Sequence, residues 1–457
     1  MADTTDYTES STGIVYGPQS ASIDKLDIIA VSGQEVDVKK LLIELSYYED
    51  IYSFVVSGSI ILRDAVGLVE KLQLTGKEYL RISFGSSSGN EKTNTYRLYT
   101  IPNKTPTGSM DQEYIKLYFC SEELFLSEQS KVTQSYKGKK VDYIIADILA
   151  NKLKISTTKL SGKIQATQGL YDFNINAMKP LEAISWVSNY ALPSGGVGAD
   201  MLFYETYDGF NFRSLRTLYK QPVYNTYTYQ QKNLDQTMQQ KYDTVIDYEF
   251  MRTFNSLDDA NSGTFSNRLI SLNPLNRTMK VTDFDYAKYV NKAGSMNGTS
   301  ALATAANRLG KAQNETPEGK LKLQFSNSEL KKRDYLAAGQ GSIAQDIFVE
   351  NFVPNRTAQL ALASFTKVKI RIPGDANIRV GKTINFNLFS LSVQGDKEDS
   401  KSLDKYYSGK YLVTAVRHII QSNGVFQTIL EISRESPATS FDAVNTSSIT
   451  IKEAASE

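Results

Sequence analysis

The fold is decided by RTAQLALASFTKVKIRIPGDANIRVGKTINFNLF (356–389) and YYSGKYLVTAVRHIIQSNGVFQTILEISRES (406–436). After a helix-like start at 356–365, alternate positions are apolar, which places them on one face of successive strands. These positions are Val368, Ile370 and Ile372; Ile384, Phe386 and Leu388; Tyr411, Val413 and Ala415; then Phe426, Thr428, Leu430 and Ile432. Gly374, Gly381, Gly409 and Gly424 stand where tight turns are needed. We predict an antiparallel β-barrel for this region.

A second region of alternation runs from Lys39 to Cys120, for example in Phe54, Val56, Gly58, Ile60 and Leu62. Its segments are separated by turn-rich pieces such as GSSSGN (85–90), a pattern typical of an antiparallel sandwich or barrel. Between the two regions the period becomes helical, in Val141, Ile144, Ile145, Ile148 and Leu149 and again after Pro180. Aromatic strand-like segments follow, so we predict an α+β insert.

The predicted class is α+β, mainly β. The expected divisions are a tail (1–24), a first barrel (25–125), the insert (126–230), a second barrel (231–272 and 356–436), an inserted lobe or loop (273–355) and a second tail (437–457). Residues 293–345 are rich in Gly, Ala, Asn and Ser and show little periodicity, which is typical of a long loop.

Composition excludes several classes of protein. The chain has 457 residues, with 51 Lys and Arg against 50 Asp and Glu, so no overall field attracts nucleic acid or anionic lipid. Its single cysteine, Cys120, cannot form an intrachain disulfide, which suits assembly in a reducing cytosol. No signal peptide or apolar run long enough to span a membrane is seen, so we expect no direct membrane insertion.

Catalytic and metal-binding motifs are missing. His418 is the only histidine and lies in a strand pattern, so we assign it a structural role and expect no enzyme activity. No HExxH, CxxC or phosphate-binding glycine motif occurs, and the acidic run at Asp258 and Asp259 lacks the spacing of a calcium loop. Glu122 with Glu123, or Glu49 with Asp50, are interpreted as ordinary charged residues. We therefore predict no catalytic residue, cofactor or metal.

One basic stripe is a candidate for contact with phosphate or an acidic partner. Lys367, Lys369 and Arg371 share one face of a strand whose other face is apolar. The alternative is a solvated face that discourages wrong strand pairing.

The two quoted segments resemble the baseplate central hub proteins of myophages, whose relatives include late-control D proteins and the N-terminal half of VgrG spikes. The Pro-Gly-Asp turn, the "V-G" step, the "SG-x-Y-L-V" and "V-x-H" motifs and a final arginine carry the resemblance. In this chain the signature residues are Pro373, Gly374, Asp375, Val380, Gly381, Gly409, Tyr411, His418 and Arg434. Residues 27–125 and 126–225 look more weakly like the first barrel and insert of that family.

The resemblance implies a homotrimer in which two similar barrels in each chain form a pseudo-sixfold ring. Such a ring adapts a sixfold tail tube above to a threefold central spike below, with baseplate wedge proteins outside and transient, non-specific passage of duplex DNA through its channel. The expected location is the tail baseplate of a virion with a contractile tail, assembled in the host cytoplasm. If the basic stripe lines this channel, reversing its charge should spare assembly and impair DNA ejection.

Three alternatives remain open at this point. One is the hub of a bacterial contractile injection or secretion system, which would pass protein effectors. Another is a tail-associated cell-wall hydrolase, and the last is a carbohydrate-binding β-protein, suggested by 28 tyrosines and 20 phenylalanines.

Overall fold

The computed structural model describes residues 22–85, 93–106, 112–160, 164–195, 198–229, 242–274, 277–293, 296, 308–325, 349–389, 403–404 and 406–436. The predicted tails therefore lie outside the described residues, except for 22–24. The same holds for most of the predicted loop at 293–345.

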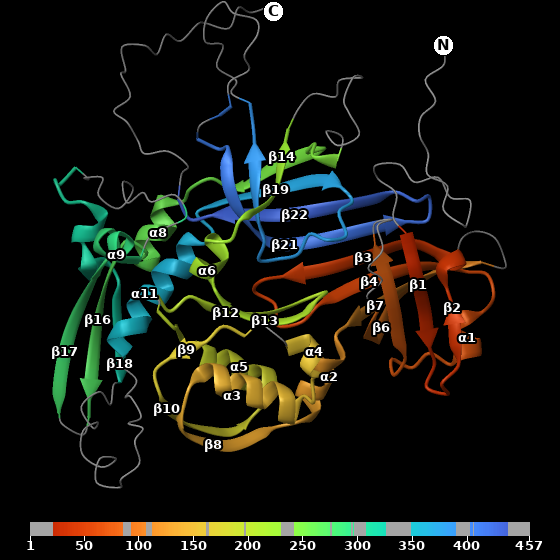
Figure 1. The fold of residues 1–457 in the computed structure, drawn as a ribbon, viewed down its shortest axis with the longest axis horizontal. Coiled ribbons are helices and arrows are strands. Elements are labelled where there is room, and N and C mark those ends of the chain that lie inside the picture. Colours follow the sequence, from red (N-terminus) through yellow and green to blue (C-terminus); the bar gives the residue numbers. More distant parts are fainter. Residues whose placement is uncertain are drawn as a thin grey trace, which may run out of the picture.

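Among the described residues, thirteen strands form one continuous sheet (Figure 1). Its N-terminal half contains β3 (Leu42–Asp50), β4 (Ser57–Asp64), β7 (Glu113–Cys120), β6 (Asn94–Pro106), β5 (Tyr79–Gly85), β1 (Ser22–Ile29) and β2 (Glu35–Asp37). Its C-terminal half contains β15 (Asp247–Arg252), β19 (Thr366–Pro373), β22 (Phe426–Arg434), β21 (Gly409–Gln421), β20 (Thr383–Asn387) and β14 (Val223–Thr228). We call these halves the first and second units.

The two units have the same strand order. The first reads β3-β4-β7-β6-β5-β1, and the second reads β15-β19-β22-β21-β20-β14. Matching strands also follow the same order along the chain. They differ in one pairing, because β1 is antiparallel to β5 whereas β14 is parallel to β20. The chain therefore contains a duplicated arrangement of six strands.

The units are joined by main-chain pairing. The second half of β21 lies antiparallel to β3, from Ala415 opposite Asp50 to Gln421 opposite Glu44. Each unit buries its own core on the face that carries Leu45 and Tyr47 in β3 and Val368 in β19. Alternate residues of each strand therefore point away from the two cores, as the period of two requires.

The prediction of two closed barrels needs correction. No pairing among the described strands closes either unit: eleven strands run as an open path from β15 to β2, and β20 and β14 branch from it at β21. Alternation identifies the faces of a strand but does not identify the neighbour at its edge. The edge of β3 pairs with β21 of the second unit.

The insert packs around a separate apolar core below the sheet (Figure 1). Its helices are α2 (Glu122–Gln129), α3 (Val141–Asp147), a π-helical turn (Ile148–Lys152), α4 (Thr157–Leu160), α5 (Pro180–Ser188) and α6 (Leu215–Tyr219). Its strands are β8 (Val132–Lys139), β9 (Thr167–Gln168), β10 (Tyr171–Met178), β11 (Leu192–Pro193), β12 (Met201–Thr206) and β13 (Gly209–Ser214). The helices predicted from Val141 and after Pro180 are confirmed.

A lobe flanks the second unit. It contains α8 (Ser256–Ser262), β16 (Ser266–Asn273), β17 (Thr278–Asp285), α9 (Tyr286–Ala293), 3-10 turns at Gln313–Glu315 and Pro317–Gly319, β18 (Leu321–Phe325) and α11 (Val349–Leu362). Strand β16 falls in the range predicted for the second barrel, but it pairs with β17 and β18 in a separate sheet. Strand β18 lies within the predicted loop, where periodicity was weak.

Two short helical turns, Lys39–Leu41 and α1 (Leu68–Leu72), complete the first unit. None of the described helices is long and apolar enough to span a membrane.

Candidate functional site: the open face of the shared sheet

The face of the sheet opposite the two cores crosses the junction without a break. We define this open face by the outward residues of five adjacent strands. They are Lys367, Lys369 and Arg371 of β19; Ile429 and Glu431 of β22; Ala415, Arg417 and Ile419 of β21; Ser46, Tyr48 and Asp50 of β3; and Ser57, Ser59 and Ile61 of β4. This face is mainly polar and carries charges of both signs, although Ser46 and Ser59 are themselves buried.

The predicted basic stripe lies on this face, but acidic neighbours compensate it. The Nζ of Lys367 is 2.7 Å from a carboxylate oxygen of Glu431. The Nζ of Lys369 is 3.3 Å from a carboxylate oxygen of Glu249. Arg371 lies opposite Asp247 in the β15–β19 ladder. The stripe is therefore part of a mixed charged surface and not an isolated basic patch.

Arg417 links the two units on the open face. Its guanidinium lies 5.3 Å from the ring centroid of Tyr48 and donates to the Ser46 hydroxyl at 3.0 Å. It also lies 3.4 Å from a carboxylate oxygen of Glu44. Since Ser46 and Tyr48 belong to β3, these contacts reinforce the main-chain pairing across the junction.

The Pro-Gly-Asp signature forms the turn after β19. Pro373 ends the strand, and the Gly374 amide donates to the Phe426 carbonyl at 3.0 Å. A Cβ at Gly374 would lie 2.1 Å from the Phe426 ring, so a side chain does not fit. The Asp375 carboxylate accepts hydrogen bonds from the Tyr224 hydroxyl at 2.9 Å and the Tyr227 hydroxyl at 3.1 Å, which ties the turn to β14.

Val380 and Gly381 contact both the first unit and the insert. The Val380 amide donates to the Glu49 carboxylate at 3.2 Å. Gly381 has a φ of +83°, and a Cβ there would lie 2.5 Å from the Tyr204 hydroxyl. Glycine is therefore needed both for the backbone conformation and for the close approach.

Gly409, Tyr411 and Arg434 form one end of the second unit. Gly409 has a φ of +135° where β21 begins. The Tyr411 hydroxyl donates to the Tyr407 carbonyl at 2.7 Å, and the guanidinium of Arg434 lies 4.9 Å from the Tyr411 ring centroid. Arg434 also donates to the Tyr406 carbonyl. A fully buried arginine is thus satisfied partly by an aromatic face and a carbonyl.

His418 lies inside the protein at the junction of the units. It is fully buried among the rings of Tyr47, Phe84 and Phe426, and its Nδ1 is 3.1 Å from the Thr428 hydroxyl. Burial, aided by the charge of Arg379, lowers its pKa well below the ordinary value. A neutral, enclosed imidazole can pack and hydrogen-bond, but it cannot reach a substrate.

A buried ion pair joins the two units and the insert. Glu49 of β3 accepts from the Tyr207 amide at 2.7 Å, and its carboxylate lies 3.7 Å from Nε of Arg379. Arg379 is also 3.7 Å from Asp208, in the β12–β13 turn. Burial raises the pKa of Glu49, while Arg379 and two amide donors oppose that rise. The sequence does not reveal this cluster, because its members are far apart along the chain.

A second buried carboxylate holds the insert against the first unit. Glu205 of β12 accepts from the Val56 amide at 3.0 Å and from the Ser121 hydroxyl. Burial, with a smaller effect from Glu123, raises the pKa of Glu205 to about 8. Glu123 itself pairs with Lys159 at 2.9 Å.

This arrangement predicts a pH-dependent stability. The folded-state pKa of Glu205 exceeds its ordinary value of 4.5, so its stabilising contribution is complete below about pH 4.5 and is lost as the pH rises toward 8. We expect Glu205→Gln to flatten the fall in thermal midpoint between pH 5 and pH 8. Glu70→Gln, at an exposed position, is the control. Parallel pH profiles for wild type and Glu205→Gln would contradict the assignment.

The carboxylate pairs considered from the sequence do not converge on a cleft. Glu49 faces the core, whereas Asp50 follows it on the open face. In α2, Glu122 accepts from the Tyr79 hydroxyl at 2.6 Å, and Glu123 is buried against Lys159. No group of three or more metal-ligating side chains occurs among the described residues. Asp259 pairs with Arg252 at 2.9 Å.

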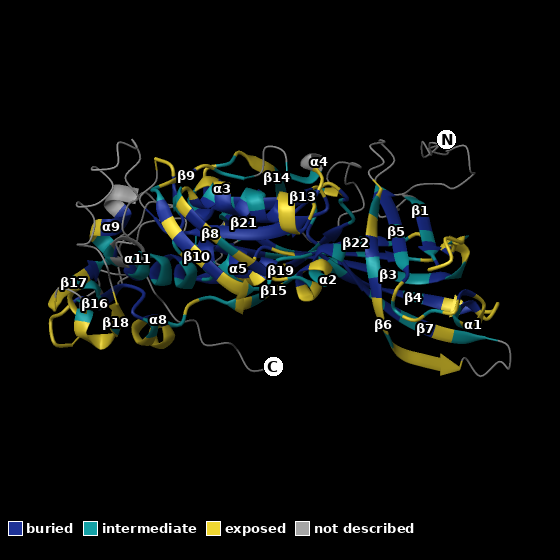
Figure 2. Ribbon diagram, turned by 90° about the horizontal axis from the view of Figure 1, so that it is seen from below, coloured by how far each residue is buried: buried dark blue, intermediate teal, exposed yellow. Residues whose placement is uncertain are grey.

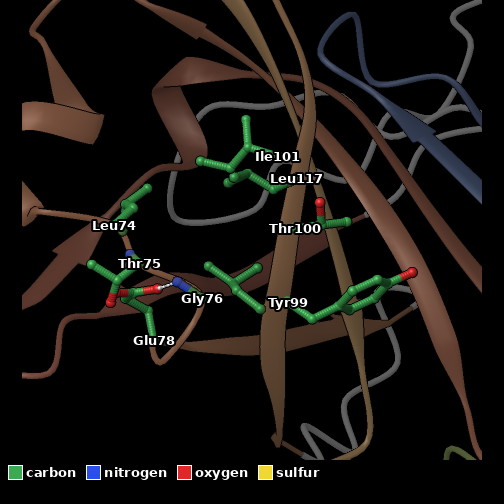
Figure 3. A pocket seen from close by; sticks show the side chains of 9 residues that line it. Leu74, Thr75, Gly76, Glu78, Tyr99, Thr100, Ile101 and Leu117 are labelled. Atoms are coloured by element: carbon green, nitrogen blue, oxygen red, sulfur yellow. Dashed lines mark hydrogen bonds between the residues drawn. The ribbon is translucent and has the colours of Figure 1, made fainter.

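A pocket of about 250 Å³ lies beside β6, at the end of its pairing with β5 (Figure 3). Its apolar lining comes from Leu74, Leu98, Ile101 and Leu117. Burial tends to raise the pKa of Glu78, but hydrogen bonds from Thr75 and Gly76 hold this pKa below its ordinary value. That carboxylate is therefore engaged in the turn, and the lining of the pocket is mixed, because Thr75, Tyr99 and Thr100 contribute to it beside the apolar residues.

Comparisons with known proteins agree with the architecture. No protein-family model matches the chain. The probable baseplate hub protein gp334 of Vibrio phage KVP40 is 22% identical over 409 residues, covering 87% of this chain and 91% of that protein. The resemblance to baseplate hub proteins is thus confirmed.

Two solved structures are similar. The tail protein of Neisseria meningitidis MC58 has a TM-score of 0.51 at 10% identity, covering 92% of this chain and 97% of that one. The 43 kDa tail protein of prophage MuSo2 from Shewanella oneidensis has a TM-score of 0.49 at 7% identity, covering 90% and 98%. The first of these likenesses shows a shared fold.

Proposed function

We propose that this protein is the central hub subunit of a contractile phage tail baseplate. Three chains form a ring of six similar units that adapts a sixfold tail tube to a threefold central spike. The observation that carries this proposal is the duplicated strand order, β3-β4-β7-β6-β5-β1 and β15-β19-β22-β21-β20-β14. Matching sixfold and threefold neighbours requires two similar surfaces in each of three chains.

The continuous sheet supports a role as a ring wall. The junction between β21 and β3 makes the open faces of both units one surface. In the proposed ring this surface lines the channel through which the genome passes. Its compensated charges suit passage, because a wall with paired cations and carboxylates binds phosphate weakly. The ring acts by shape and charge and performs no catalysis.

The relationship to a probable baseplate hub protein supports the location in the virion. In this proposal the hub assembles in the host cytoplasm, with wedge proteins on its outer side. Immunogold labelling of purified virions tests this directly. Label at the centre of the tail baseplate is expected, and label on the capsid, or none on the virion, would refute the proposal.

The basic stripe gives a test of the channel. Reversing its charges would set new carboxylates beside Asp247, Glu249 and Glu431, so glutamine is the cleaner replacement. We expect the triple variant K367Q/K369Q/R371Q to retain its oligomeric mass and to lower plaque titre about tenfold, because the remaining carboxylates repel phosphate. The matched control is K131Q/K139Q/K140Q, in and beside β8 of the insert. An unchanged titre for the stripe variant would exclude a DNA-facing role.

A further inference from the structure

Two strand edges at opposite ends of the paired units have no neighbour among the described residues. One is the outer half of β6, residues 101–106, which pairs with β7 on one side and is exposed from residue 102 onward (Figure 2). The other is β15, which pairs with β19 on one side and presents its second edge. Free edges of this kind offer main-chain groups to another chain.

The duplicated strand order indicates which strand should pair with each of these two open edges. Strands β6 and β21 match at their start, because Arg97 pairs with Tyr79 and Cys120 just as Leu412 pairs with Thr383 and Ser433. A register shift follows at the same place in both, after Leu98 in β6 and after Val413 in β21, and β6 has a second shift between Thr100 and Asn103 that β21 lacks. Beyond the shared shift β21 pairs with β3, whereas β6 has an open edge. The strand that corresponds to β3 in the second unit is β15.

We propose that residues 101–106 of β6 pair antiparallel with β15 of a second copy of this chain, which repeats between molecules the β21–β3 junction found within one. This inference rests on the proposed function, because it specifies how three copies close the ring. The contact is head to tail, so each copy offers one β6 edge and one β15 edge. Closure after six units requires three chains.

The internal junction also gives the register. Thr105 pairs with β7 at the position where Ile419 pairs with the matching strand β22, so Thr105 corresponds to Ile419. In the same way, Glu249 pairs with β19 where Ser46 pairs with the matching strand β4, so Glu249 corresponds to Ser46. Ile419 and Ser46 are opposite each other within the chain. Thr105 of one copy should therefore lie opposite Glu249 of the next.

The pocket beside β6 fits this junction. Within one chain, Ile51 follows β3, donates its amide to the Thr414 carbonyl at 2.9 Å, and buries its side chain in the core of the second unit. The matching place in the first unit is the pocket lined by Leu74, Leu98, Ile101 and Leu117. The apolar residue that follows β15 is Phe254, which is 66% exposed. We assign Phe254 of the second copy to this pocket.

Two prolines shape the same edge. Pro102 and Pro106 carry no amide hydrogen, so the outer half of β6 offers fewer donors than an ordinary strand. This protects the free chain against indiscriminate strand pairing. Recognition of the correct partner then depends more on Phe254 and its pocket.

Cysteine cross-linking tests the register. The double variant Thr105→Cys with Glu249→Cys, treated with diamide, should give disulfide-linked dimers and trimers on non-reducing gels. Both positions are exposed, and Cys120 is buried, so neither folding nor the native thiol should interfere. The matched control is Lys104→Cys with Glu249→Cys. Lys104 points to the opposite face of the strand, so the yield of disulfide-linked product from this control pair should be lower by about tenfold or more. Equal yields from the two pairs would overturn the register.

A second variant tests the docking of Phe254. We expect Phe254→Arg to convert the assembly to monomers of 51.0 kDa by light scattering, while Val31→Arg, at another exposed apolar position, leaves it unchanged. If the wild type is trimeric and Phe254→Arg remains trimeric, the proposed junction is wrong and the hub function stands. If the wild type is itself monomeric at micromolar concentration, the hub proposal fails.

Discussion

Replacing Arg379 with methionine should lower the unfolding free energy by about 3–5 kcal/mol, because it leaves the Glu49 carboxylate buried without its cation. The guanidinium lies 3.7 Å from both Glu49 and Asp208 and 4.9 Å from the ring centroid of Tyr207. These partners belong to the first unit and the insert. Loss of the arginine should therefore weaken the contacts among the first unit, the second unit and the insert. The thermal midpoint of unfolding measures the loss of stability.

The double variant E49Q/R379M is the control. A neutral glutamine removes the isolated charge and can keep one of the two hydrogen bonds from the Tyr207 and Val380 amides, because only its oxygen accepts, so it should recover part of the lost stability. If R379M alone melted within about 1 °C of the wild type, the ion pair would not hold the junction, because a loss of that size corresponds to a fraction of a kcal/mol.

Gly58→Ala should also be strongly destabilising. Gly58 lies in the middle of β4, and a Cβ there would be 2.2 Å from the ring of Phe119 and 2.6 Å from the main-chain oxygen of Ser46. Because Ser46 belongs to β3, which is paired on both edges, the backbone cannot easily move away. We expect a loss of about 3 kcal/mol, at the upper end for overpacking a core.

Gly319→Ala provides the comparison, since nothing lies within 4 Å of a Cβ at that position. It should melt close to the wild type, whereas Gly58→Ala should melt several degrees lower. Equal melting temperatures for the two variants would mean that the packing between β3, β4 and β7 is looser than described.

The local parts of this fold could be predicted from the sequence. Alternation at Val368, Ile370 and Ile372 identified a strand and its buried face, and Pro180 marked the start of α5. These features depend on neighbouring residues. Burial of His418 also follows from its place in an alternating strand.

The pairing between distant strands could not be predicted in this way. The β21–β3 junction joins residues separated by more than 300 positions, and no local pattern specifies which edge receives which strand. The duplication is hidden because matching positions carry different residues: Gly58 matches Val368, and Ser59 matches Lys369. The carboxylates that compensate Lys367 and Lys369 come from β22 and β15, so the charge of the stripe also depends on the fold.

Electron cryomicroscopy of the assembled protein is the decisive test of the pseudo-sixfold ring. We expect a closed ring of three chains, with six units of matching strand order around a channel and sheet pairing continuous through every junction. A chain that remains monomeric at micromolar concentration, or a ring whose copies meet through other surfaces, would contradict it.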